Sequence, residues 1–314
     1  MNSSKPMLLV DGNNLLMRAF YAGQKTGMSQ DGVHTGPLLI FINTLAKHIR
    51  EEQPSRVAVA WDGGRSAKRI AIDGEYKSTR EVAPNLHEFR QSVFSLAHEF
   101  CALAGVYQQH LPGVEADDLI AAWWYYYDPY QASGNSITIL SSDKDFLQLV
   151  GNSPSNIPTS LVRLSSGGAG TDRWTEDRMV EELGFRPQDW PLITALTGDS
   201  VDHVPGVPGI GPKRAAKLLE ESDWDLDKAL THPRISAHAP QVRKSLELVD
   251  LRTPFLQLEP PPPWRPTRAT DIGWTQLTGF LDLYGLTTVR EKMISNTLWA
   301  KSTTPTPGRH LGSR

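Results

Sequence analysis

Nine carboxylate residues occupy five short segments that lie far apart along the chain. Three of these segments follow the apolar runs MLLV, VAVAW and ITIL, which have the character of strands buried on both faces. Because parallel strands end at one edge of a sheet, we expect their aspartates to converge there. The other two segments, GVEADD and GDSVD, carry acids three positions apart. The nine residues are Asp11, Asp62, Glu115, Asp117, Asp118, Asp143, Asp145, Asp199 and Asp202.

Each acid alone could serve as a helix N-cap, since Asp is a favoured capping residue. Carboxylates that met without counter-charges would destabilise the fold, because two unit charges ~4 Å apart repel by about 1 kcal/mol in water and by several times more inside a protein. A site built only from carboxylates favours Mg²⁺ or Mn²⁺ over Zn²⁺. Nine acids exceed the needs of one Mg²⁺, which retains several waters. We therefore predict a site for two ions, whose usual chemistry is in-line displacement at phosphorus.

A second candidate site is the segment VPGVPGIGPKRAAK at 204–217. Its unit Gly209-Ile-Gly211 predicts a tight hairpin whose backbone N–H groups can approach an anion, and Pro212 suits the first position of the following helix. This pattern is typical of helix-hairpin-helix motifs, which bind nucleic-acid phosphates without reading bases. An ordinary corner between two helices is the alternative. The cations of the segment are Lys213, Arg214 and Lys217.

A cationic stretch lies between Asp62 and the next predicted helix. It contains Arg69, the pair Tyr76-Lys77 and Arg80. A solvated surface loop is the ordinary interpretation of such a stretch. Because it follows an aspartate of the predicted site, its cations could stabilise charge that develops on a phosphate, and Tyr76 could stack on a base.

The elements that must position these residues alternate in the first half of the chain. Strands separated by helices imply an α/β fold with a mostly parallel sheet and right-handed crossovers. We expect these helices at 15–21, 38–50, 86–103 and 116–127.

From about residue 175 onward the signals are nearly all helical, so a second, α-helical domain is expected. A segment at 152–171, rich in Ser, Pro, Gly and Asn, indicates a loop around a short strand at 161–164. The run at 259–267 indicates a polyproline II spacer, and 303–314 a frayed tail. The expected helices of the second half are 174–183, 187–196, 212–220 and 239–251.

Composition excludes several classes of protein. With 314 residues, of which 39% are hydrophobic and 21% charged, the chain is ordinary globular material for about two domains. No apolar run approaches the ~18 residues of a membrane span, and no signal peptide is recognised, so we expect a cytosolic protein. The single cysteine, Cys101, rules out an internal disulfide and a thiolate zinc site.

The net charge does not exclude nucleic acid as a ligand. Thirty-two Lys and Arg against 35 Asp and Glu give 32 − 35 = −3. If bound cations neutralised the nine clustered acids, 35 − 9 = 26 would remain and the balance would be 32 − 26 = +6. The position of the acids therefore matters more than their sum.

The sequence resembles the 5′-nuclease, or flap endonuclease, superfamily, especially bacteriophage 5′-3′ exonucleases and the 5′-nuclease domain of bacterial DNA polymerase I. Five segments carry the resemblance, in family order over residues 7–251. They are VDGNNLLMRAFYA at 10–22, WDGGRSAKRIAIDGEYKSTR at 61–80, GVEADD at 113–118, SSDKDF at 141–146 and TGDSVDHVPGVPGIGPKRAAKLL at 197–219.

This resemblance implies an architecture. A PIN-like nuclease domain would occupy 1–174, with a helical arch at about 63–90. A helical DNA-binding domain would occupy 175–298, with a helix-hairpin-helix-type motif at about 198–220. Residues 299–314 would form a disordered tail.

The resemblance also implies roles for the nine acids. Asp117 would be shared between two metal ions, and Asp118 and Asp202 would lie in or near the outer shell. The first ion would be held mainly by Asp11, Asp62, Glu115 and Asp117. The second would be held by Asp117, Asp143, Asp145 and Asp199.

Further roles follow from the same resemblance. Lys77 and Arg80 would be catalytic cations that face the scissile phosphate, with Tyr76 against the terminal nucleotide. His203 departs from the asparagine that is common in the family at this position, and the turn carbonyls are compatible with a bound K⁺. DNA contacts are implied for Arg18, Thr35, Arg69, Tyr76, Gly209, Gly211, Lys213, Arg214 and Lys217.

Together these observations predict a hydrolase: a Mg²⁺-dependent 5′-3′ exonuclease and 5′-flap endonuclease, with Mn²⁺ as a substitute ion, that leaves 5′-phosphate products. Its partners would be DNA with 5′ flaps, 5′ ends or branches, and RNA primers in RNA–DNA hybrids. We expect a monomer acting in replication and repair in the cytosol of a bacterium, or of the host of a phage. Two alternatives remain open: a non-catalytic structure-specific DNA-binding protein, and a PIN-like ribonuclease.

Overall fold

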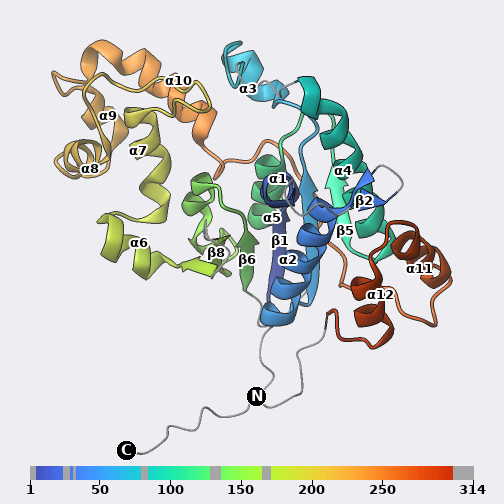
Figure 1. Ribbon diagram of the computed structural model, residues 1–314. Coiled ribbons are helices and arrows are strands. Elements are labelled where there is room, and N and C mark those ends of the chain that lie inside the picture. The colour runs from blue at the N-terminus through green and yellow to red at the C-terminus, as the bar shows by residue number, and fades with distance from the viewer. Residues whose placement is uncertain are drawn as a thin grey trace, which may run out of the picture.

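The computed structural model describes residues 5–23, 29–30, 33–78, 84–127, 136–164 and 171–299. A sheet lies at the centre of these residues, with helices on both of its faces (Figure 1). The strands of the sheet are β1 (Met7–Asp11), β4 (Arg56–Trp61), β5 (Tyr107–His110), β6 (Ile137–Leu140), β7 (Gly151–Asn152), β8 (Pro158–Leu164) and β9 (Thr171–Trp174).

The strand order is β5-β4-β1-β6-β8-β7, with β9 paired to β8. All pairs among β5, β4, β1, β6 and β8 are parallel, as predicted, whereas β7 and β9 run antiparallel to β8. Met7 lies opposite both Arg56 and Ile137, so the three strands that precede acidic segments are in register. A separate antiparallel pair is formed by β2 (Ser29–Gln30) and β3 (Val33–His34).

Helices cross over between the parallel strands. The predicted helices are confirmed, with starts a few residues earlier than expected for the first three, and a short helix after β4 was not predicted. None of the helices in the described ranges is long and apolar enough to cross a membrane. The helices are α1 (Gly12–Gly23), α2 (Gly36–Glu52), α3 (Ala67–Ile72), α4 (Pro84–Leu103), α5 (Ala116–Tyr126) and the 3₁₀ helix η2 (Lys144–Leu149).

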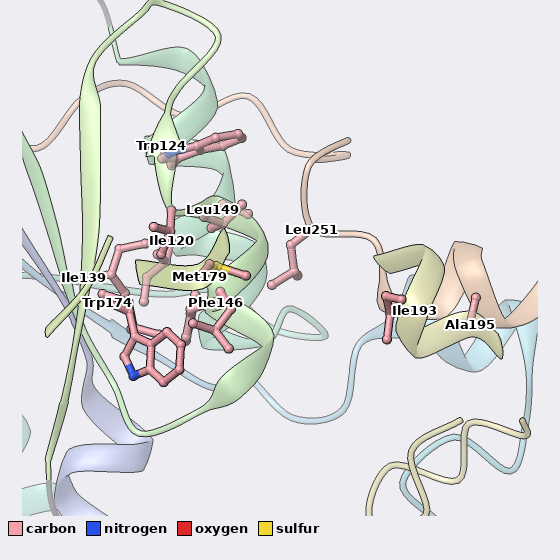
Figure 2. Close-up of a cluster of buried hydrophobic side chains, with 14 of the residues drawn as sticks. Ile120, Trp124, Ile139, Phe146, Leu149, Trp174, Met179, Ile193, Ala195 and Leu251 are labelled. Carbon is pink, nitrogen blue, oxygen red and sulfur yellow. The ribbon is translucent and has the colours of Figure 1, made fainter. Parts of the chain in front are cut away.

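The sheet separates two hydrophobic cores, because successive side chains of a strand point to opposite faces. Met7 and Leu9 of β1 belong to the core that includes α5 and η2. Leu8 and Val10 belong to the core that includes α1, α2 and α4. Figure 2 shows part of the first core, including the fully buried Trp124 of α5. The uninterrupted apolar runs in the sequence are therefore explained by strands with two buried faces.

Residues 176–249 form a helical region, as predicted. Three of its helices, α7, α8 and α10, form its centre, because α7 packs against both of the others. The expected helix at 187–196 is divided into a 3₁₀ turn and a shorter α-helix. The elements are α6 (Glu176–Leu183), η3 (Pro187–Asp189), α7 (Trp190–Thr197), α8 (Pro212–Glu220), α9 (Leu226–Leu230), η4 (Ser236–His238) and α10 (Ala239–Val249).

After α10 the chain returns to the sheet region. The proline-rich run contains neither helix nor strand and is held in place by hydrogen bonds: Arg56 donates to the carbonyl of Pro261, and Trp264 N donates to Ser55 O at 2.9 Å. Helices α11 (Trp274–Leu283) and α12 (Thr287–Ile294) then pack in the core of α2 and α4. Figure 1 shows them in red, on the other side of the sheet from the yellow and orange helical region. Residues 264–298, predicted to lie in the helical domain, thus pack in the core of the first domain, and so does Trp299, which was predicted to begin the tail.

Candidate metal and nucleic-acid site

The aspartates at the strand ends meet at one edge of the sheet. Asp11 is the last residue of β1, and its two carboxylate oxygens accept hydrogen bonds from Asn14 N at 2.9 Å and Ser141 Oγ at 2.8 Å. Asp62 follows β4 and accepts a hydrogen bond from Ala116 N at 2.8 Å. The ends of β1 and β6, and the end of β4 with the start of α5, are therefore tied together by these acids.

The start of α5 brings three more acids to this edge. Glu115 is the N-cap of α5, and each of Glu115, Asp117 and Asp118 offers one oxygen within 4.8 Å of the others. The loop before α5 hydrogen bonds to the loop after β4 through Gly63 N to Val114 O at 2.7 Å. A Cβ on Gly63 would lie 1.7 Å from Leu111 O, so this approach requires glycine.

The segment after β6 contributes Asp143 and Asp145. Asp143 is the N-cap of η2 and accepts a hydrogen bond from Asp145 N at 2.9 Å. The Oδ1 atom of Asp145 is buried without a hydrogen-bond partner among the described residues. Burial, followed by the charges of Asp143 and Asp202, raises the pKa of Asp145 to about 8. This carboxyl group therefore has an oxygen that is available to a ligand.

The fifth segment closes the site from the helical region. Asp199 and Val204 exchange two backbone hydrogen bonds of 2.8 Å, which makes a tight loop. Asp199 forms an ion pair with Lys144 of η2 at 3.0 Å, and Asp202 lies 3.5 Å from Lys77 Nζ. The convergence that the sequence predicts for the five segments is therefore observed, and we refer to the nine acids together as the acidic cluster.

Two cations neutralise part of the acidic cluster from inside. Arg69 lies 2.6 Å from Glu115, 2.9 Å from Asp118 and 3.3 Å from Asp117, and its Nε donates to a backbone carbonyl of the helical region at 3.0 Å. Lys77 Nζ lies 2.8 Å from Glu115 Oε1. Arg69 is 3% exposed and Lys77 is 8% exposed. Buried charges require partners of opposite sign, which explains this arrangement.

Burial and the neighbouring charges together determine the pKa of each acid. Burial raises the pKa of Asp11 to about 8, with a further contribution from Asp62. Burial and then Asp117 raise the pKa of Asp118 to about 7. Although part of Asp62 reaches solvent, surrounding protein atoms raise its pKa to about 6 by desolvation. Burial alone would raise the pKa of Asp117, but Arg69 and Lys77 lower it. The cluster thus carries more carboxyl groups than its two internal cations can hold ionised.

Three predicted DNA contacts differ from the structure. Arg69 is buried in the acidic cluster, and Tyr76 is 3% exposed, donates to Glu115 Oε2 at 3.1 Å and packs with Val204, so neither presents an open surface to a nucleic acid. Thr35 is fully buried, and its carbonyl accepts the first-turn hydrogen bond of α2. In each case tertiary packing, which a polar sequence segment does not reveal, removes the side chain from solvent. The predicted catalytic residue Arg80 lies outside the described residues.

A cleft of about 1090 Å³ opens beside the acidic cluster. Asp62, Glu115 and Lys77 line this cleft, together with Arg65 and Arg90. Arg65 belongs to the cationic stretch predicted after Asp62, whereas Arg90 and the asparagines after Asp11 were not predicted as site residues. Asn13 accepts from Asp62 N, and Asn14 accepts from Ser142 N, each at 2.9 Å. The signal was present, because both asparagines follow the first aspartate directly.

The predicted hairpin joins α7 to α8. Gly209 adopts a left-handed φ of 75°, Gly211 is the N-cap of α8, and Arg214 donates to the carbonyl of Gly209. The side chains of Lys213, Arg214 and Lys217 are all exposed. The tight glycine turn between two helices, expected for the segment, is therefore observed.

The structure also describes Arg18 and His203, the two other positions that the sequence singled out. Arg18 lies partly buried on α1, the helix that directly follows Asp11. His203 adopts a φ of 58°, in the left-handed region where Asn and His are enriched among non-glycine residues. Histidine at this position therefore preserves the backbone requirement that asparagine would meet.

Two family models match successive parts of the chain. Residues 6–184 match the family described as 5′-3′ exonuclease, N-terminal resolvase-like domain, and 185–255 match the 5′-3′ exonuclease, C-terminal SAM fold. A 5′-3′ exonuclease of Aquifex aeolicus is 33% identical over 69% of this chain and 70% of its own length. A 5′-3′ exonuclease of Bacillus subtilis is 33% identical over 80% of this chain and 81% of its own length.

The chain also resembles one part of larger proteins. It is 31% identical to DNA polymerase I of Mycobacterium tuberculosis over 79% of this chain but only 27% of that enzyme. Among solved structures, the T5 D15 protein co-crystallised with metal ions superposes with a TM-score of 0.64 and 19% identity, covering 94% of this chain and 98% of that chain. The catalytic core of Rad2 with a DNA substrate gives a TM-score of 0.56, 13% identity and coverage of 94% and 93%. These two likenesses establish the fold.

Proposed function

The chain belongs to the 5′-3′ exonuclease family, and from this premise we propose that its acidic cluster hydrolyses phosphodiester bonds at DNA 5′ ends and 5′ flaps with two divalent metal ions. One observation carries the proposal: carboxylates from five segments converge beside an open cleft that is lined by two of them, Asp62 and Glu115, and by cations. The relatives with the name 5′-3′ exonuclease are identical to the chain at a third of the aligned residues.

The residues of the acidic cluster fit divalent cations. Glu115, Asp117 and Asp118 already bring oxygens within 4.8 Å of each other, and Asp145 has a buried oxygen without a partner among the described residues. Oxygen-only donor sets favour Mg²⁺ and Mn²⁺. Ions held here would supply activated water and neutralise charge that develops at phosphorus. The proposed ligands of the two ions are Asp11, Asp62, Glu115, Asp117, Asp143, Asp145 and Asp199, with Asp118 and Asp202 beside them.

Lys77 and Arg69 have different parts in this proposal. Lys77 lines the cleft and contacts Glu115, so its ammonium group can turn from the carboxylate to a phosphate when the carboxylates receive other counter-charges. Arg69 does not line the cleft, and its Nε is bound to the carbonyl of Leu248, so it holds the start of α5 against the helical region. We therefore assign phosphate contact to Lys77, together with Arg80, and a positioning role to Arg69.

The hairpin between α7 and α8 supplies the second contact with DNA. Exposed Lys213, Arg214 and Lys217 surround the amino end of α8, where backbone N–H groups favour an anion. These groups would bind the phosphates of a duplex without reading its bases. A potassium ion on the turn carbonyls belongs to the same proposal, and it would compete with Arg214 for the carbonyl of Gly209.

The proposed substrates are DNA with 5′ ends, flaps or branches, and RNA primers in RNA–DNA hybrids, handled by a monomer in the cytosol during replication and repair. A 5′-labelled DNA flap and an RNA flap of identical shape would be incubated with Mg²⁺, with Mn²⁺ and with EDTA. We expect cleavage of the DNA flap that requires either ion. DNA binding without cleavage under every condition would indicate a non-catalytic binding protein, and exclusive cleavage of RNA would indicate a ribonuclease.

A further inference from the structure

The guanidinium group of Arg69 lies among the three acids at the start of α5. Its Nη1 atom is 2.6 Å from Glu115 Oε2 and 3.3 Å from both Asp117 Oδ1 and Asp118 Oδ2. Its Nη2 atom is 2.9 Å from Asp118 Oδ1 and 3.3 Å from Asp117 Oδ2. The sixth carboxylate oxygen, Glu115 Oε1, lies 2.8 Å from Lys77 Nζ. Every carboxylate oxygen of these three acids is therefore close to a cationic nitrogen.

The same three acids, Glu115, Asp117 and Asp118, are those that bring oxygens within 4.8 Å of one another, as the ligands of one ion must. A divalent ion at this triad and the guanidinium of Arg69 therefore draw on the same oxygens. Two cations this close repel each other strongly where protein shields them from water. Ion binding at the triad thus opposes the present contacts of Arg69.

Arg69 has little room to move aside within the acidic cluster. It is 3% exposed, and on the side of Asp145 and Asp202 it borders a cavity of about 10 Å³. A volume of this size holds about one water molecule, which is much smaller than a guanidinium group. If an ion takes the oxygens of the triad, the segment that carries Arg69 has to loosen.

That segment, 66–78, connects the triad to the helical region. The Nε atom of its arginine donates to a carbonyl of α10 at 3.0 Å, and Lys77 N donates to Asp202 O at 3.2 Å. Tyr76 donates to Glu115 Oε2 at 3.1 Å. Lys77 has a φ of 52°, which is unfavourable for a residue with a side chain. The turn at this lysine therefore depends on the contacts that hold it, and two of them end on Glu115.

We propose that Arg69 is an exchangeable counter-ion of the acidic cluster. The oxygens of the triad pass from Arg69 to a bound divalent ion, and this exchange releases Tyr76 and Lys77 from Glu115. The inference rests on the metal ions of the proposed function and adds an order of events: the ammonium group of Lys77 becomes available to a phosphate only at a site that holds metal. Arg69 acts through the acids, so it is a positioning residue.

The first test measures Mn²⁺ binding to the full chain without DNA, from the electron paramagnetic resonance signal of free Mn²⁺. Arg69→Gln keeps a planar polar group but removes the charge, so we expect Mn²⁺ to bind at least about tenfold more tightly. Arg69→Lys retains the charge and should stay within about threefold of the unmodified protein. A purely structural role of Arg69 predicts the opposite result for Arg69→Gln, because acids that lose their support bind an ion more weakly.

The matched control is Arg243→Gln, because Arg243 of α10 pairs with the exposed Asp227 and not with the acidic cluster. Its Mn²⁺ affinity should not change. Unchanged or weaker binding in a folded Arg69→Gln variant would overturn the proposal, as would equal tightening in Arg69→Lys. In both cases normal Mn²⁺ binding by the unmodified protein leaves the nuclease assignment intact, whereas no Mn²⁺ binding at all would overturn that assignment as well.

Hydrogen exchange on the unmodified protein tests the release of the turn without relying on the folding of any variant. Saturating Mg²⁺ should speed exchange of the Lys77 amide, which donates to Asp202 O, by about tenfold. The amides of β1, which lie in the centre of the sheet, provide the internal control and should not exchange faster. Exchange of the Lys77 amide that stays the same or slows in Mg²⁺ would contradict the exchange of counter-ions.

Discussion

The acidic cluster and the hairpin use charged residues in opposite ways. In the cluster, Arg69 and Lys77 are buried and paired with carboxylates. In the hairpin, Lys213 and Lys217 are exposed, and Lys217 lies 3.8 Å from Glu221 in a solvated ion pair at the end of α8. Exposed pairs of this kind contribute little to stability. In the proposed function, the buried charges of the cluster therefore determine the chemistry of the site, whereas the exposed charges of the hairpin determine how tightly DNA is bound.

The largest loss of cleavage is expected when one acid is removed from the cluster. Asp143→Asn keeps the shape of the η2 cap but removes a charge, so we expect flap cleavage in Mg²⁺ to fall by about 10³-fold. Binding of the flap in Ca²⁺ or EDTA should change by less than about threefold, because affinity is assigned to other residues. Asp227→Asn, an exposed aspartate of α9, is the control. Undiminished turnover in Asp143→Asn would reject the assignment of the cluster.

Replacing Lys77 tests whether this buried cation contributes to the cleavage step or to DNA binding. Lys77→Ala removes the ammonium group that lines the cleft, and we expect single-turnover cleavage to slow by about 10²-fold. Flap affinity should fall much less. The matched control is Lys47→Ala on α2, whose lysine is exposed beside Glu51. An affinity loss that accounts for the whole drop in rate would place Lys77 with the hairpin cations instead.

The hairpin should show the opposite behaviour. Lys213→Ala should weaken binding to duplexes of every sequence, and the slope of log K against log salt should become shallower by roughly one ion. Cleavage at saturating enzyme should be nearly unchanged. Fluorescence anisotropy at several salt concentrations measures the slope, with Lys228→Ala on α9 as the control. A loss confined to some sequences would contradict a phosphate contact.

The smallest expected effect concerns the stability of the metal-free protein. The pKa of Asp145 is raised to about 8 in the folded state, against about 4 in an unfolded chain. Between these values the folded state binds the proton more strongly, so this contribution to stability is lost as pH rises from about 4 to about 8. Thermal unfolding in EDTA should therefore show a lower Tm at pH 8.5 than at pH 5.5.

Asp145→Asn removes one such group and should make this fall in Tm shallower by a few degrees, about 2 to 4 °C for each kcal/mol. Mg²⁺ should restore the Tm of the unmodified protein at pH 8.5, because it binds the ionised carboxylates of the folded state. A Tm that rises with pH in EDTA would contradict the burial of these carboxyl groups. Asp227→Asn should leave the pH profile unchanged.

The convergence of the acids was predictable because an aspartate follows each of three apolar runs within three residues. The same logic failed for β5, whose sequence YQQH at an edge of the sheet has no apolar pattern. The burial of Arg69 and Tyr76 could not be predicted, since it depends on α10 packing against α3 from more than a hundred residues away. Likewise, the helix at 274–283 was not predicted, and its sequence does not say which of the two cores will receive it.

The return of the chain after α10 has a mechanical consequence. The helical region is joined to the sheet region at two places, before α6 and after α10, and the second crossing is secured through Arg56 and Trp264. The two regions also share one hydrophobic core, and Gln148 of η2 donates to Val249 O at 3.0 Å. These contacts fix the helical region, and with it Asp199 and Asp202, in position relative to the remaining acids.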